Sequence, residues 1–113
     1  MASAYVSNLV INAGVDFEQV FTLEDGANNA PINLTDYGLS AQMRKHATAT
    51  GVTTFTTSFY DAPNGKIQIG LSTSQTSSLK PGRYVYDVVI TNTSNKMERV
   101  VEGMVLVSPG VTR

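Results

Sequence analysis

Residues Leu79–Val88, with the sequence LKPGRYVYDV, decide which fold this chain adopts. Pro81 fixes φ and Gly82 tolerates a tight bend, so the chain turns sharply at this point. Tyr84 and Tyr86 then alternate with smaller or polar residues, which predicts that a strand begins directly after the bend. This order is typical of a tyrosine corner in a β-sandwich. We therefore expect the Tyr84 hydroxyl to bond back to the loop backbone and Tyr86 to point into the core.

Short alternating segments continue on both sides of this stretch, separated by turn signals such as Asn64-Gly65. A break in the alternation over 72–79 is rich in Ser and Thr and predicts one helical turn with a capping side chain. The pattern predicts an all-β, immunoglobulin-like antiparallel β-sandwich of about seven strands. One domain should span residues 1–113, with short N-terminal and C-terminal extensions. The predicted strands cover residues 5–11, 17–23, 39–44, 54–59, 67–71, 84–91 and 97–107.

Composition limits the classes of function. The chain has 113 residues, 42% hydrophobic and 15% charged, which fits one folded domain. Because it has no cysteine, it can form neither a disulfide nor a thiolate metal site. The N-terminus lacks the pattern of a signal peptide, and no apolar run approaches membrane-spanning length, so we expect no membrane partner. A formal net charge of −1 gives no bulk attraction to nucleic acid, and we expect no nucleic-acid partner.

Charge is distributed unevenly along the chain. Every charged residue before Arg44 is acidic, and basic residues occur only from Arg44 onward. One explanation is chance combined with the way the chain folds. The alternative is that the chain forms two oppositely charged surfaces that meet between copies. The acidic residues concerned are Asp16, Glu18, Glu24, Asp25 and Asp36.

No set of residues predicts catalysis or metal binding. His46 is the only histidine, so no histidine metal set can form, and only one imidazole is available to activate a serine. Nothing in the sequence singles out a nucleophile, with His46 or with a lysine as its base. Asp36, Asp61 and Asn64 could offer oxygens to calcium, but they lack EF-hand spacing and fit turn hydrogen bonding equally. We therefore expect no enzyme activity, no cofactor and no metal.

The first and last strands carry apolar residues on both faces. Such a strand either lies in the middle of a sheet or contacts a partner, for example along a free strand edge. The partner alternative gives a candidate interface of Tyr5, Val6, Leu9, Met104, Leu106, Val111 and Arg113.

Four segments together carry a family resemblance. They are NLTDY at 33–37 leading to QMRK at 42–45, NGKIQI at 64–69, LKPGRYVYD at 79–87 and RVVEG at 99–103. In this order, over about Phe17 to Val107, the chain resembles the small immunoglobulin-like domain of tailed-bacteriophage virion proteins, such as the N-terminal domain of baseplate upper proteins. Those proteins continue into shaft and receptor-linking regions that have no counterpart in this sequence, so we expect a stand-alone module.

The resemblance implies a virion structural protein, assembled in the host cytoplasm. We expect a small decoration, cement or adaptor module that binds the capsid through a β-edge and loops. Its partners would be capsid or tail subunits and further copies of itself. Two alternatives stay open: a tail, neck or baseplate accessory protein, and a module that recognises the host surface through loops containing Tyr37 and Tyr60.

Overall fold

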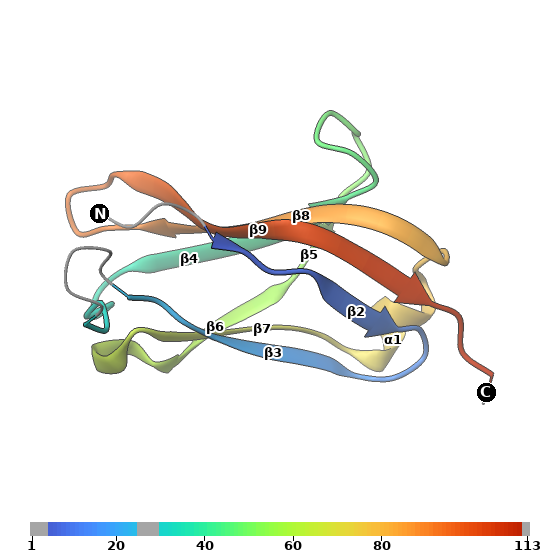
Figure 1. The fold of residues 1–113 in the computed structure, drawn as a ribbon, viewed down its shortest axis with the longest axis horizontal. Coiled ribbons are helices and arrows are strands. Elements are labelled where there is room, and N and C mark those ends of the chain that lie inside the picture. Colours follow the sequence, from blue (N-terminus) through green and yellow to red (C-terminus); the bar gives the residue numbers. More distant parts are fainter. Residues whose placement is uncertain (1–4, 25–29, 112–113) are drawn as a thin grey trace.

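The computed structural model describes residues 5–24 and 30–111, and it forms two β-sheets packed face to face (Figure 1). The six-stranded sheet, called the large sheet below, has the order β1-β9-β8-β4-β5, with β2 also paired to β9. The three-stranded sheet, called the small sheet, has the order β3-β7-β6. The predicted all-β, immunoglobulin-like sandwich is confirmed. The large sheet consists of β1 (Tyr5–Val6), β2 (Leu9–Asn12), β4 (Gly38–Arg44), β5 (Thr53–Thr54), β8 (Gly82–Thr91) and β9 (Met97–Ser108), and the small sheet of β3 (Phe17–Thr22), β6 (Thr56–Asp61) and β7 (Lys66–Leu71).

The core lies between the sheets and follows the period-two pattern of the strands. β7 buries every second side chain, and β8 does the same between Tyr86 and Ile90. Three rings join the two layers: the Phe55 ring lies 6.1 Å from the Phe17 ring and 6.2 Å from the Tyr86 ring, centroid to centroid. Burial of the apolar side chains between the two sheets is the main stabilising contribution to the fold.

The first strand differs from the prediction. It divides into β1 and β2, and both pair parallel to β9, so the large sheet is not wholly antiparallel. The break falls at Ser7-Asn8, where the Asn8 side chain accepts the Met104 N–H at 3.0 Å in place of a backbone carbonyl. Gly103 allows this approach, because a Cβ there would lie 2.2 Å from the Ser7 carbonyl oxygen. The alternation of side chains contains no information on strand direction, so this pairing cannot be predicted from the pattern.

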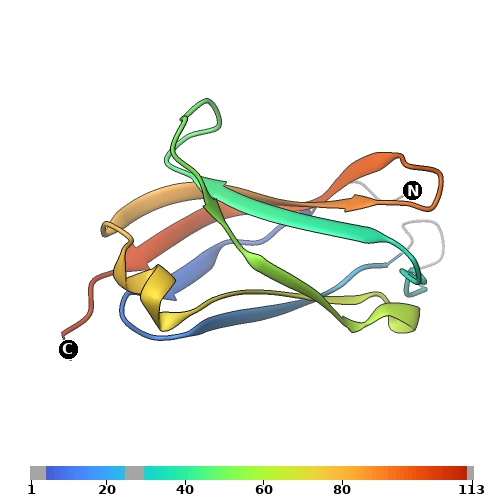
Figure 2. The ribbon, with the colours of Figure 1, turned by 180° about the vertical axis from the view of Figure 1, so that it is seen from behind.

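The strand expected at 54–59 also divides. β5 belongs to the large sheet and β6 to the small sheet, and the chain crosses between them at Phe55 (Figure 2). The Phe55 side chain is buried, and its N–H donates to the Ala41 carbonyl at 3.0 Å. One buried ring with a retained backbone hydrogen bond therefore fixes the point where the chain changes sheets.

The predicted helical turn is confirmed as α1 (Thr73–Ser77). Ser72 and Gln75 form a capping box, in which each side chain bonds the backbone of the other residue. The buried Thr76 hydroxyl accepts the Gly14 N–H at 3.1 Å and donates to the Val15 carbonyl at 2.8 Å. Through these hydrogen bonds α1 holds the β2–β3 turn next to the chain segment that leads into β8. A second short helical segment, η1 (Ala62–Asn64), connects β6 to β7. No helix in residues 5–24 and 30–111 has both the length and the apolar character to cross a bilayer.

Candidate interaction surface

The bend in front of β8 has the geometry of a tyrosine corner. The Tyr84 hydroxyl donates to the Lys80 carbonyl at 2.7 Å, four residues back along the chain. Pro81 precedes Gly82, whose φ of +140° is open to glycine and strained for other residues. The Lys45 ammonium lies 5.0 Å from the centre of the Tyr84 ring and packs on its face. These contacts fix the start of β8 and therefore the position of every side chain along it.

Tyr86 faces inward and is 4% exposed. Its hydroxyl donates to the Ser7 carbonyl at the break between β1 and β2. Burial raises the pKa of the Tyr86 phenol above its ordinary value of 10.0, and the hydrogen bond to Ser7 acts in the opposite direction. This contact holds the N-terminal strand against β9. Like the tyrosine corner, it is a structural contact that positions the surface described next.

The outer face of the large sheet carries a group of exposed apolar side chains, called the apolar strip below. β9 lies between β8 and the β1–β2 strand, so its inward side chains, including Val101, Val105 and Val107, are buried in the core. The opposite face of the same strands has no such cover among the described residues. Val10 lies directly beside Leu106 in the ladder, and Val6 lies beside Glu102. The apolar strip consists of Val6, Val10, Met104 and Leu106, with exposed fractions of 70%, 57%, 47% and 48%.

The structure separates the members of the predicted interface. Val6, Met104 and Leu106 come together in the apolar strip, whereas Leu9 does not, because strand alternation turns it into the core, where it is 6% exposed. Tyr5 is placed by its backbone, which pairs with Val101. Val111 is exposed beyond the end of β9. Arg113 lies outside the described residues. The predicted interface did not include Val10. Because side chains alternate along β2, Val10 lies on the other face of the strand from Leu9 and Ile11.

A shallow hollow of about 500 Å³ continues from the apolar strip across the outer face of the large sheet. The connection 45–52, called the arm, rises beside the hollow on the β4–β5 side of the sheet (Figure 1). Arg44 holds the arm through a 2.7 Å hydrogen bond from its guanidinium to the Ala49 carbonyl. On the floor of the hollow, the Arg99 guanidinium bonds the Asp87 carboxylate at 3.1 Å and lies 3.5 Å from that of Glu102. These charges neutralise one another in part, which leaves the apolar strip as the open part of the face.

The polar residues considered for chemistry take part in local turn contacts. The His46 ring lies 3.1 Å from the Thr48 hydroxyl within the arm. The Asp61 carboxylate accepts the Asn64 amide at 2.8 Å, and Asp36 has a positive φ of 66° in a turn. Within residues 5–24 and 30–111, no three His, Asp or Glu side chains are grouped so as to hold a metal ion.

The two loop tyrosines of the host-recognition alternative are not equivalent. Tyr37 packs against the core and is only partly exposed. Tyr60 lies within β6, on the small sheet, and is 63% exposed. The structure therefore places Tyr60 in a strand and not in a loop, and leaves the Tyr37 ring only partly available to a ligand.

The solved structures named below resemble this chain only distantly. No protein-family model matches the chain, and no curated protein sequence matches it. Among solved structures, it is similar to an internalin-like protein of Listeria monocytogenes, lmo2027, at 16% identity and a TM-score of 0.47, over 93% of this chain and 28% of that one. It is also similar to a family 123 glycoside hydrolase of Clostridium perfringens that hydrolyses glycolipid glycans, at 13% identity and a TM-score of 0.43, over 96% of this chain and 24% of that one. The chain thus spans about a quarter of the length of each of these proteins.

Proposed function

We propose that this chain is a structural protein of a tailed-bacteriophage virion, a small decoration, cement or adaptor module that binds the capsid. The observation that carries the proposal is the apolar strip, since four exposed apolar side chains on one rigid sheet face form a surface for protein binding. The four sequence segments that resemble the virion immunoglobulin-like domain support the choice of partner. In this proposal the chain acts by binding, and no residue has a catalytic role.

The binding mechanism is geometric. The strip side chains project from β1, β2 and β9, whose backbones are fixed by the β8–β9 ladder and by the Tyr86–Ser7 hydrogen bond. Little conformational freedom is therefore lost when a partner covers them. Burying each fully exposed Val, Leu or Met would contribute about 1.5–3 kcal/mol, and these half-exposed side chains contribute less. Because a particle presents many symmetry-related sites, a modest contact at each site can give a stable attachment.

The edge of the large sheet offers a second type of contact. β2 pairs with β9 on one side, and among the described strands it has no neighbour on the other. A free edge of this kind can accept a strand from a partner. Val10 lies on this edge strand and also belongs to the apolar strip, so an added strand would contact both the edge and the face.

The test is to purify the particles and measure their composition by mass spectrometry. We expect the chain in stoichiometric amounts in the capsid. Leu106→Glu should reduce incorporation about tenfold or more, because it places a charge in the strip. Ser77→Glu, on the exposed end of α1, introduces the same charge away from the strip and should leave incorporation unchanged.

Other outcomes select the alternatives. Recovery of the chain only in tail, neck or baseplate fractions would replace the capsid role by an accessory role in the tail. Absence from particles, together with binding of the isolated chain to host cells, would overturn the virion proposal in favour of a host-surface recognition module.

A further inference from the structure

The two sheets, each taken with its loops, carry opposite net charge. On the small sheet and its adjoining turns, the described residues include four carboxylates and one lysine, a net charge of −3: Asp16, Glu18, Glu24, Asp61 and Lys66. On the large sheet and its loops, six basic residues oppose four carboxylates, a net charge of +2: Arg44, Lys45, Lys80, Arg83, Lys96 and Arg99 against Asp36, Asp87, Glu98 and Glu102. The uneven distribution along the sequence thus becomes a difference between the two faces of the molecule.

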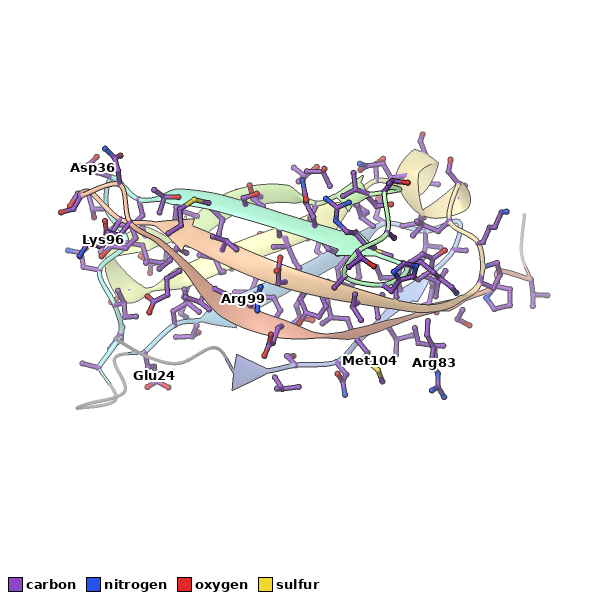
Figure 3. All side chains as sticks on the ribbon, turned by 90° about the horizontal axis from the view of Figure 1, so that it is seen from above. Glu24, Asp36, Arg83, Lys96, Arg99 and Met104 are labelled. Carbon is purple, nitrogen blue, oxygen red and sulfur yellow. The ribbon has the colours of Figure 1, made fainter. Side chains whose placement is uncertain are left out.

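Charges of opposite sign also lie at the same ends of the two sheets. Asp16 lies at the start of β3, and its carboxylate accepts the Thr73 N–H at 2.8 Å, which places it at the α1 end of the molecule. β8 starts at the same end, with Arg83 on the other sheet. At the opposite end, Glu24 follows β3 and Lys96 lies in the β8–β9 turn. Figure 3 shows Glu24, Asp36 and Lys96 at one end of the molecule, and Arg83 with Met104 towards the other.

This arrangement fits a stack made by translation. If the large-sheet face of one copy is laid on the small-sheet face of the next in the same orientation, Arg83 approaches the Asp16–Glu18 end and Lys96 approaches Glu24. Two large-sheet faces packed together would instead bring basic residues against basic residues at the α1 end. The charge pattern therefore favours unlike faces in contact over like faces.

The contact uses the part of the large-sheet face that the arm leaves open, since the arm rises above this face on the β4–β5 side (Figure 1). The apolar strip runs along the β1, β2 and β9 side of the large sheet, away from the arm on the β4–β5 side. The small-sheet face has an exposed Val20 on β3 and a shallow hollow of about 310 Å³, which includes Gly70 and is bordered by Asp16 and Glu18. A hollow with a glycine in its floor has room for protruding side chains such as Met104 and Leu106.

We propose that copies of this chain associate head to tail, with the large-sheet face of one copy on the small-sheet face of the next. The proposal rests on the proposed function only in taking the apolar strip as an assembly surface. Apolar contact at the strip stabilises the pair, and the surrounding charges set its orientation and accelerate association. Because the two contacting faces differ, the contact leaves one free face at each end and can extend into a row.

The experiment uses the purified chain alone, studied by sedimentation velocity over a range of concentrations. The wild type should form concentration-dependent oligomers that weaken with added salt, since the charge pairs lie at the rim of the contact. Two variants each block one face: Arg83→Glu with Leu106→Glu on the large sheet, and Glu18→Arg with Val20→Arg on the small sheet. Each variant alone should bind itself at least about tenfold more weakly than the wild type.

The decisive sample is the equimolar mixture of the two variants. Each has one intact face that complements the intact face of the other, so the mixture should sediment faster than either variant alone. The variant Ser74→Glu with Ser77→Glu changes the net charge by the same amount as Arg83→Glu but lies on α1, and it should associate like the wild type. Circular dichroism of every variant checks that the sandwich is folded.

Three results would overturn the proposal. These are a wild type that stays monomeric at all concentrations, a small-sheet variant that still associates with itself, and an equimolar mixture that sediments no faster than either variant alone. None of them bears on whether the chain is present in purified particles, so failure here is distinguishable from failure of the virion assignment.

Discussion

Replacing Tyr84 by phenylalanine removes one hydroxyl and keeps the ring that contacts Lys45. The lost group donates a 2.7 Å hydrogen bond to the Lys80 carbonyl at the bend that starts β8. A net hydrogen bond contributes about 0.5–1.5 kcal/mol to the free energy of unfolding. Because this bond lies near the surface, water can satisfy the freed carbonyl, and we expect a loss of about 1 kcal/mol. For a chain of this size that corresponds to a fall in Tm of about 4 °C.

The assay is thermal unfolding followed by circular dichroism, with urea unfolding as a second measure of the free energy. Tyr60→Phe is the matched control, since it removes the same hydroxyl from an exposed tyrosine whose side chain makes no hydrogen bond to the described residues. The control should melt within about 1 °C of the wild type. Equal melting temperatures for Tyr84→Phe and Tyr60→Phe would refute the role of the tyrosine corner in stability.

Three further substitutions test the contacts that position the surface. Tyr86→Phe should cost about 1–3 kcal/mol, because it leaves the Ser7 carbonyl without its donor. The pKa of the Tyr86 phenol is raised in the folded state, so the unfolded chain loses this proton first as the pH rises. In a pH series of urea titrations, the free energy of unfolding of the wild type should therefore fall above about pH 10, and that of the variant should fall less steeply. Gly103→Ala places a Cβ 2.2 Å from the Ser7 carbonyl oxygen and should displace the N-terminal strand. We expect the free energy of unfolding to fall by about 2 kcal/mol, and amide exchange to become faster in β1 and β2 than in β8. Ser72→Ala removes the α1 cap bonded to Gln75 and should lower the free energy of unfolding by about 1 kcal/mol, whereas an unchanged value would mean that the capping box contributes nothing.

Much of the fold could be predicted from the sequence, because it depends on local patterns. The alternation along β7 and β8 turns every second side chain towards the core, and both strands lie where the pattern predicts them. Pro81 and Gly82 marked the bend, and the Ser-rich break marked α1. These features follow from interactions between residues close in the chain, which a single sequence contains directly.

The remaining features depend on contacts between distant residues. The parallel pairing of β1 and β2 with β9 needs Gly103 opposite Ser7, and the crossing between sheets at Phe55 needs the carbonyl of Ala41. Periodicity indicates that a residue alternates, but not which strand lies beside it. For this reason the pattern predicts Leu9 in the interface although it is buried, and does not distinguish the exposed Val10.

A reconstruction of the purified particle tests the virion assignment and its attachment surface most directly. The proposal predicts ordered copies of this sandwich on the capsid, with Val6, Val10, Met104 and Leu106 covered by a neighbouring protein. A particle without this sandwich, or one in which those four side chains face solvent in every copy, would contradict it.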